Sequence, residues 1–250
     1  MSGHSKACCT VPPAPEPDYK PQGDYTKLNG LKTYVTGPKD ADKAILVLYD
    51  IFGFKNQILQ GADLLAWSDK DSTYQVFMPD FFQESGPADI AWYPPDTDEK
   101  QAKLGEWFGN AAPPKHLPKV ASIIEDAEKE NSNIKSWGMI GYCWGGKMVS
   151  LISGKEGTKF KAGVQTSPAL VDVSEAPKVK IPMCVLPSKE EPKDDWNKYN
   201  EGLTVPKHFE WFDTVPHGFM SARCDVNDPE HKKQYERGYK IAVDFFNKHL

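Results

Sequence analysis

The sequence predicts a single α/β domain in which helices flank both faces of a mainly parallel sheet of about seven or eight strands. Two observations predict this class. Short apolar segments such as residues 44–49 alternate with amphipathic segments along most of the chain. In addition, the glycine-rich residues 141–145 (GYCWG) join an apolar segment to a helical pattern. The 250 residues contain no internal repeat and no long linker, which favours one domain.

The elements follow in order. Residues 1–27 are rich in proline and polar residues and are expected to be extended, and the folded domain is expected over residues 28–250. Strands are expected at residues 31–35, 44–49, 74–78, 134–140, 161–165, 182–186 and 208–213. Helices are expected at residues 58–66, 99–108, 118–130 and 144–154, after Pro192, and at 229–248. Residues 83–118 hold six prolines and interrupt the alternation, which is more typical of a functional segment than of an idle one.

Charge and cysteine content exclude several functions. A net charge of -5 gives no reason to expect nucleic-acid binding, and no segment has the apolar length of a membrane span or a secretory signal. Cys8 and Cys9 are too close for an ordinary disulfide or a metal knuckle. Five cysteines without a framework spacing indicate free thiols in a reducing compartment, so a cytoplasmic protein is expected. We expect no cofactor and no metal, a small-molecule ligand, and a monomer or weak homodimer.

Cys143 is the candidate nucleophile. It lies between a predicted strand and a predicted helix, where small neighbours such as Gly141 and Gly145 let the two elements approach closely. The N-terminus of the following helix favours a thiolate. The alternative is a buried structural cysteine in a glycine-rich turn.

His217 is the candidate base, because it lies in a loop between the last predicted strand and the last helix. The order nucleophile, acid, histidine then requires the acid to follow the strand at 182–186. Glu190 is the first choice, Glu191 the second and Asp194 the third. The alternatives are a loop histidine with an incidental hydrogen bond and a solvated acidic segment.

Two backbone N–H groups are candidates for an oxyanion hole. One belongs to Trp144, directly after Cys143, and the other to Ile51, in the loop after the strand at 44–49. Asp50 ends that strand near the nucleophile elbow, which is the sharp turn predicted at residues 141–145. Its carboxylate could contact the thiol or a solvent molecule, or cap the next turn.

Four segments, in this order and spacing, resemble the dienelactone hydrolase family of α/β-hydrolases: residues 50–53 (DIFG), 79–82 (PDFF), 141–146 (GYCWGG) and 217–219 (HGF). The resemblance extends from about residue 28 to the end. It implies an α/β-hydrolase fold and a Cys-His-acid triad that acts on small esters or lactones, as in carboxymethylenebutenolidase. It also implies acyl transfer to Cys143 and hydrolysis of the thioester by water.

This sequence departs from the family pattern at three places. Glu190 aligns where the family has an aspartate, and Asp50 stands where bacterial members have a glutamate. Family members hold a substrate carboxylate with arginines, but residues 83–118 contain none, which makes Arg223 the nearby candidate. Two other functions stay open: ligand binding without catalysis, and a redox role for Cys143. Cys184 is expected in the core, so it is not an evident resolving thiol.

Overall fold

A computed structural model describes residues 18–67, 69, 73–93 and 95–250, and within them one eight-stranded sheet forms the centre of the molecule. The strand order is β1-β2-β4-β3-β5-β6-β7-β8. The first two pairings, β1 with β2 and β2 with β4, are antiparallel, and the remaining pairings are parallel. The strands are β1 Asp24–Leu28, β2 Leu31–Thr36, β3 Lys43–Leu48, β4 Gln75–Pro79, β5 Ser136–Tyr142, β6 Phe160–Thr166, β7 Met183–Leu186 and β8 Lys207–Phe209.

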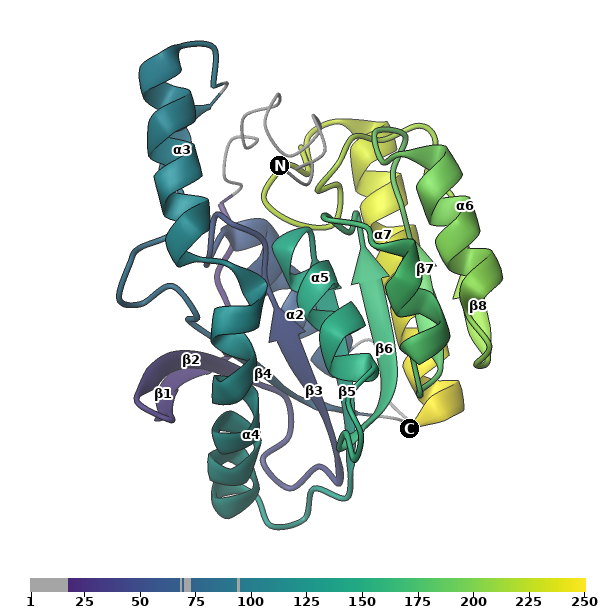
Figure 1. Ribbon diagram of the computed structural model, residues 1–250. Coiled ribbons are helices and arrows are strands. Elements are labelled where there is room, and N and C mark those ends of the chain that lie inside the picture. The colour runs from purple at the N-terminus through teal and green to yellow at the C-terminus, as the bar shows by residue number, and fades with distance from the viewer. Residues whose placement is uncertain (1–17, 68, 70–72, 94) are drawn as a thin grey trace.

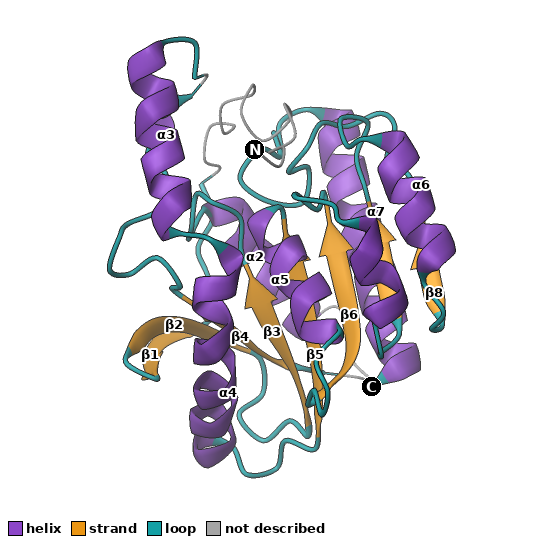
Figure 2. Ribbon diagram, in the orientation of Figure 1, coloured by secondary structure: helices purple, strands orange, loops and turns teal. Residues whose placement is uncertain are grey.

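Helices cover both faces of this sheet, which confirms the predicted α/β class. Figures 1 and 2 show α4 and α5 in front of the strands and α2 and α7 behind them. The central strands β3, β4 and β5 are buried almost throughout, as continuous apolar segments between two helical layers require. The helices are α2 Asn56–Trp67, α3 Asp98–Asn110, α4 Pro113–Glu130, α5 Trp144–Ser153, α6 Lys193–Gly202 and α7 Pro229–His249, with 3₁₀ helices η1 Ile90–Trp92 and η2 Val173–Lys178.

Three boundaries differ from the sequence-based expectation. The sheet begins with β1, which starts within residues 1–27, expected to be an extended segment outside the folded domain, and ends at Leu28. Helix α4 begins at Pro113 rather than at Pro118, because prolines at the first helical positions have a suitable φ and need no N–H donor there. The last strand, β8, ends at Phe209, and pairing resumes only as a single bridge between Ser188 and Phe212. Cys8 and Cys9 lie outside the described residues.

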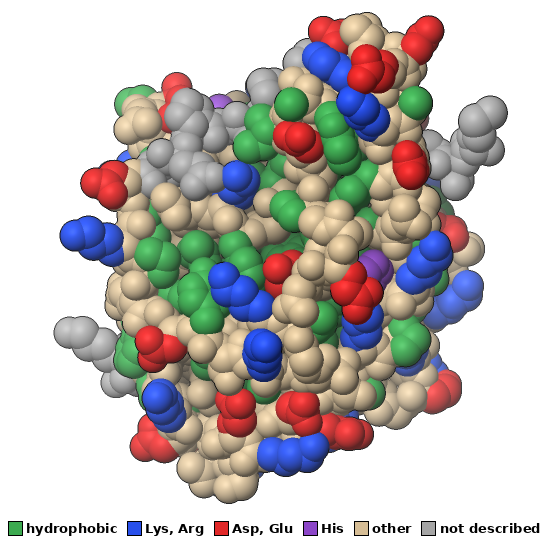
Figure 3. All heavy atoms as spheres, turned by 90° about the vertical axis from the view of Figure 1, so that its left-hand side faces the viewer, with side chains coloured by type: hydrophobic (Ala, Val, Ile, Leu, Met, Phe, Trp, Pro, Cys, Tyr) green, Lys and Arg blue, Asp and Glu red, His purple; other side chains and the backbone are tan. Residues whose placement is uncertain are grey.

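The proline-rich residues 83–118 contain η1, α3 and the start of α4. Helix α3 projects from the carboxyl end of the sheet, and Figure 3 shows hydrophobic side chains gathered beneath it and charged ones at its projecting end. Trp107 anchors this helix: its indole N–H donates to the Gly86 carbonyl at 2.9 Å, and its ring lies 4.9 Å from that of Phe82. The segment is therefore packed onto the core through its aromatic residues.

The loops that follow β3, β5, β6, β7 and β8 all lie at one end of the sheet, because these strands run parallel. This end is where open α/β sheets bind ligands. Helix α5, which directly follows β5, starts there with its N-terminus. No helix within the described residues combines the length and the apolar character that a membrane crossing needs.

Candidate active site

Cys143 occupies a sharp turn between β5 and α5. Its φ of 52° and ψ of −108° lie outside the regions that L residues ordinarily adopt. Hydrogen bonds hold this conformation: its N–H donates to Thr166 of β6 at 3.2 Å, and its carbonyl accepts from Gly146 at 3.0 Å and Ala169 at 3.1 Å. The side chain is buried, with 4% of its surface exposed. Strained backbone of this kind is common at functional sites.

Two glycines make the turn possible, because they let α5 lie close to β5 and to β3. A Cβ at Gly141 would lie 2.1 Å from the carbonyl oxygen of Gly145, and a Cβ at Gly145 would lie 1.8 Å from that of Leu48 in β3. Any side chain at these positions would push α5 away from β5 and β3. The spacing of the two glycines thus places Cys143 at the N-terminus of α5, where the helix dipole favours an anion.

His217, in the loop after β8, and Glu191, in the loop after β7, form a buried pair. The imidazole Nδ1 lies 2.5 Å from Oε1 of Glu191, and both side chains are almost fully buried. The other carboxylate oxygen of Glu191 accepts from the backbone N–H of Ser188. A carboxylate at Nδ1 fixes the tautomer and orientation of the ring, so that Nε2 is the nitrogen available for proton transfer.

The choice of Glu190 as partner of the imidazole is therefore wrong, and the neighbouring Glu191 takes that position. Glu190 instead accepts the backbone N–H of His217 at 3.1 Å through Oε2. Asp194, the third choice, is exposed in the first turn of α6. The carboxylate that contacts the imidazole thus comes from the expected loop, here called the acid loop, but from Glu191 rather than Glu190.

Local structure explains why Glu191 points inward. The N–H of Glu190 donates to the Ser188 hydroxyl at 3.3 Å, which closes a turn directly after β7. Glu191 follows this turn and precedes Pro192, a position that favours extended backbone. The acid loop is also bound to the segment between β8 and α7 that carries His217, here called the histidine loop. The backbone N–H of Lys189 donates to the Val215 carbonyl at 3.2 Å.

Trp144 and Ile51, whose N–H groups are the candidate oxyanion donors, follow β5 and β3 respectively. Trp144 is the first residue of α5, where a backbone N–H has no partner within its own helix. Its indole N–H donates to the Ala111 carbonyl at 2.6 Å, which links α5 to the segment before α4. Ile51 is buried directly after Asp50, and its carbonyl accepts from Ala88 at 2.8 Å.

Asp50 connects two loops of the site. One carboxylate oxygen accepts from Phe52 at 2.9 Å, and the other accepts from Ala222 in the histidine loop at 3.1 Å. The side chain is 3% exposed. A buried carboxylate with two backbone donors joins the loop after β3 to the loop that carries His217.

Arg223 follows Ala222 in the histidine loop and lies against Phe52 of the loop after β3. Its guanidinium carbon is 5.7 Å from the ring centroid of Phe52 and 6.0 Å from that of Tyr93. The side chain is 4% exposed and packs over Gly218. The positive charge is therefore held against two aromatic rings.

Sequence reasoning missed one part of the site, the loop of residues 167–172 between β6 and η2. Ala169 and Cys143 form a small buried cluster outside the main core, and Leu170 packs against it. The position of this loop could have indicated it, because it follows the strand next to β5 at the carboxyl end of the sheet. Its residue types carry no signal of their own.

The sheet order and the turn at Cys143 define an α/β-hydrolase fold. The chain belongs to the dienelactone hydrolase family, whose model matches residues 31–250. An AIM2 family protein of Schizosaccharomyces pombe is 32% identical over 248 residues, which cover 96% of this chain and 98% of the relative. The human carboxymethylenebutenolidase homolog is 25% identical over 241 residues, covering 93% and 94% of the two chains.

The crystal structure of dienelactone hydrolase from Anabaena variabilis has the same fold. It matches with a TM-score of 0.68 at 14% sequence identity, covering 93% of this chain and 100% of the other. The expected family and fold are confirmed, and membership places the chain among hydrolases.

Proposed function

We propose that this protein hydrolyses small esters or lactones by acyl transfer to Cys143. The buried pair of His217 and Glu191 is the observation that carries the proposal, since the two loops that hold it start at the same end of the sheet as Cys143. A thiol needs a base to become a strong nucleophile, and an imidazole oriented by a carboxylate is such a base. Family membership supports hydrolysis as the reaction class.

In the proposed reaction, Nε2 of His217 takes the proton of the Cys143 thiol, and the thiolate attacks the acyl carbon. The carbon–oxygen bond of the ester breaks, and the leaving alkoxide receives the proton from the imidazolium. Water then attacks the thioester while His217 takes its proton, and the Cys143 thiol is restored. Glu191 stabilises the imidazolium that forms in each half of the cycle.

The backbone N–H groups of Ile51 and Trp144 are proposed to bind the developing oxyanion. The start of a helix suits this task, because its N–H groups point at the ligand and its dipole favours negative charge. In this proposal Asp50 positions the Ile51 loop through its two backbone hydrogen bonds rather than touching the thiol. Arg223 is proposed to contact a carboxylate on the substrate, away from the reacting carbon.

The test compares hydrolysis of p-nitrophenyl acetate and of dihydrocoumarin, a small lactone, by the wild type and by Cys143→Ala. We expect kcat/KM to fall by about a thousandfold or more while the melting temperature stays close to that of the wild type. Cys184→Ala is the matched control, because Cys184 is buried in β7 outside the site. Undiminished turnover by Cys143→Ala would refute the proposal.

A further inference from the structure

The loop of residues 167–172, here called the β6–η2 loop, lies directly against Cys143. The N–H of Ala169 donates to the Cys143 carbonyl at 3.1 Å. Leu170 packs against the small cluster that Cys143 and Ala169 form outside the main core, and its side chain is partly exposed. Leu170 is therefore part of the surface that a substrate at Cys143 would meet.

Two residues of this loop have left-handed backbone, Ser167 with φ 39° and Leu170 with φ 56°. A bulky residue such as leucine rarely adopts this region, whereas glycine does so without strain. The chain nevertheless carries leucine at this point, next to the candidate nucleophile. Such an outlier at a candidate site indicates that the side chain contributes something other than stability.

The start of the loop is fixed to the sheet and to α5. The N–H of Ser167 donates to the Leu186 carbonyl at the end of β7, at 2.9 Å. Pro168 packs on Gly146, where an added Cβ would come within 2.8 Å of the proline Cβ. The strained residues are thus held between the end of β7 and the first turn of α5.

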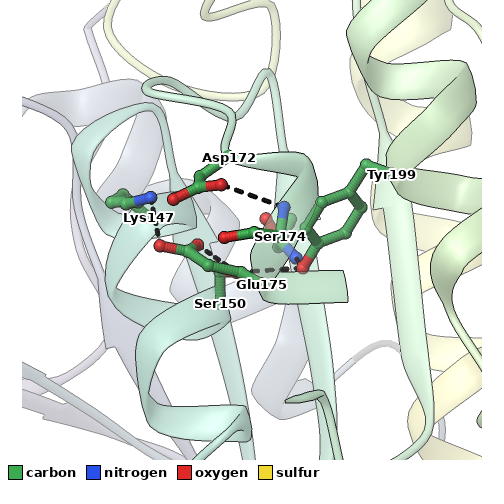
Figure 4. A network of polar contacts seen from close by, with 7 residues as sticks. Lys147, Ser150, Asp172, Ser174, Glu175 and Tyr199 are labelled. Carbon is green, nitrogen blue, oxygen red and sulfur yellow. Dashed lines mark hydrogen bonds and ion pairs between the residues drawn. The ribbon is translucent and has the colours of Figure 1, made fainter. Parts of the chain in front are cut away.

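A partly buried polar network holds the other end of the loop through η2 (Figure 4). Glu175 of η2 pairs with Lys147 of α5 at 2.5 Å and accepts from the Ser150 hydroxyl at 2.8 Å. Ser150 also bonds the Tyr199 hydroxyl of α6 at 2.9 Å. Glu175 and Lys147 are 12% and 14% exposed, so water screens their attraction less than at an open surface. The network ties η2 to the same helix that starts at Cys143.

The chemistry of the loop indicates what it would accept. Residues 167–171 (SPALV) contain no charged side chain, and the first charge, Asp172, is used to cap η2 by accepting from Ser174 at 2.9 Å. Arg223, the residue suited to an anion, lies on the histidine loop instead. The surface next to Cys143 on the loop side is therefore apolar.

We propose that Leu170 is a specificity-determining residue, which forms the apolar wall beside Cys143 and limits the acyl group to a short uncharged chain. Glu175 acts as a positioning residue, because its bonds to Lys147 and Ser150 hold η2 and hence the loop. This inference rests on the proposed hydrolysis and names the acyl part of its substrates: small and apolar, with any carboxylate on the side of Arg223.

The test measures kcat/KM for p-nitrophenyl esters from acetate to octanoate. In Leu170→Gly we expect the ratio of octanoate to acetate to rise about tenfold or more, because space opens for the longer chain. The melting temperature should fall little, because relief of the backbone strain offsets the lost contacts of the leucine side chain. Leu64→Ala, a partly buried leucine of α2, should leave the ratio unchanged. A ratio in Leu170→Gly within about twofold of the wild type would overturn the inference.

Glu175→Gln tests the positioning role. Loss of the ion pair should raise the octanoate-to-acetate ratio of kcat/KM by a smaller factor than Leu170→Gly does. The change should come from a lower KM for octanoate, with kcat little changed. In the Leu170→Gly background the added substitution should have no further effect on the ratio, which a merely structural role would not predict. Should Glu175→Gln fold poorly, Tyr199→Phe removes one hydroxyl of the network and is measured in the same way. An unchanged ratio in a folded network variant contradicts this role.

A second readout separates failure of this inference from failure of the proposed function. Alkylation of Cys143 by iodoacetamide and by N-hexyl iodoacetamide needs no hydrolysis, and Leu170→Gly should react relatively faster with the hexyl reagent. Cys8→Ser and Cys9→Ser remove other reactive thiols, while burial raises the pKa of the Cys184 thiol and raises that of Cys224 to about 12. If the wild type hydrolyses no ester but the alkylation ratio shifts, only the proposed function fails. If Cys143-dependent hydrolysis occurs and neither ratio shifts, only this inference fails.

Discussion

Glu190 and Glu191 are neighbours in the chain, yet they bind different atoms of the same histidine. Glu191 contacts the ring at Nδ1, whereas Glu190 accepts the backbone N–H. A ring contact stabilises the imidazolium and selects the tautomer, but a backbone contact only fixes the loop. Of the two residues, only Glu191 can therefore stabilise the imidazolium that catalysis would need.

Substitution of each glutamate by glutamine should separate these roles. We expect Glu191→Gln to lower kcat/KM for p-nitrophenyl acetate by about a thousandfold to ten-thousandfold, because the amide favours the wrong tautomer and does not balance the imidazolium charge. Glu190→Gln, the matched control, should cost less than about tenfold. Similar losses in the two variants would contradict the assignment of Glu191.

Asp50 offers a second prediction at the residue scale. Asparagine keeps one acceptor oxygen but turns an NH₂ group toward one of the two N–H donors, Phe52 or Ala222. We expect Asp50→Asn to lower the free energy of unfolding by about 1–3 kcal/mol, measured by urea denaturation, and to lower kcat as well. Asp225→Asn, at an exposed turn where the carboxylate accepts from Asn227, should change neither quantity appreciably. A neutral Asp50→Asn would show that the two loops are held without this carboxylate.

At the scale of elements, α5 organises the site. It starts directly after Cys143, packs on β3 and β5 through two glycines, and carries Lys147 and Ser150, which contact Glu175 of η2. Helix α4 supports it from outside through His116, whose ring lies 5.4 Å from that of Trp144 and 5.9 Å from that of Phe82. Helix α4 thus packs directly on the first residue of α5.

His116 gives this packing a pH dependence. Burial, helped by the charge of Lys119, lowers the pKa of His116 from 6.5 to about 4. Between these values the unfolded chain binds a proton at this residue and the folded chain does not, so stability falls as the pH drops from about 6.5 to about 4. Above that window the residue contributes no pH dependence.

His116→Phe should remove this contribution, since phenylalanine fits among the same rings and has no proton to bind. We expect the fall in melting temperature between pH 7 and pH 4.5 to be smaller in this variant than in the wild type. His231→Phe, at a partly exposed histidine near the start of α7, is the control. An equal fall in His116→Phe and wild type would show that His116 is not responsible.

At the scale of the whole molecule, much of the fold was predictable because each buried strand is a short apolar segment and each helix has an apolar face. Residues 141–146 predicted the elbow, since close approach of strand and helix leaves glycine as the residue that fits. The loops that carry the histidine and the acid were predictable from chain order alone. The start of helix α4 was not predictable in the same way, because a proline such as Pro113 can begin a helix as well as interrupt one.

The remaining features depend on tertiary contacts that the order of residues does not show. Which of two adjacent glutamates faces His217 depends on the turn that Ser188 closes. The contact of Leu170 with the Cys143 cluster depends on how the β6–η2 loop is held by β7, α5 and η2. Neither a residue type nor a spacing predicts such an arrangement.

Acid-quenched mass spectrometry of the wild type during turnover of p-nitrophenyl acetate tests the central claim most directly. The account predicts one acetyl group per chain, on the peptide that contains Cys143, released by hydroxylamine at neutral pH as a thioester is, and absent from Cys143→Ala. An acetyl group on another peptide that is resistant to hydroxylamine, together with full turnover by Cys143→Ala, would contradict it.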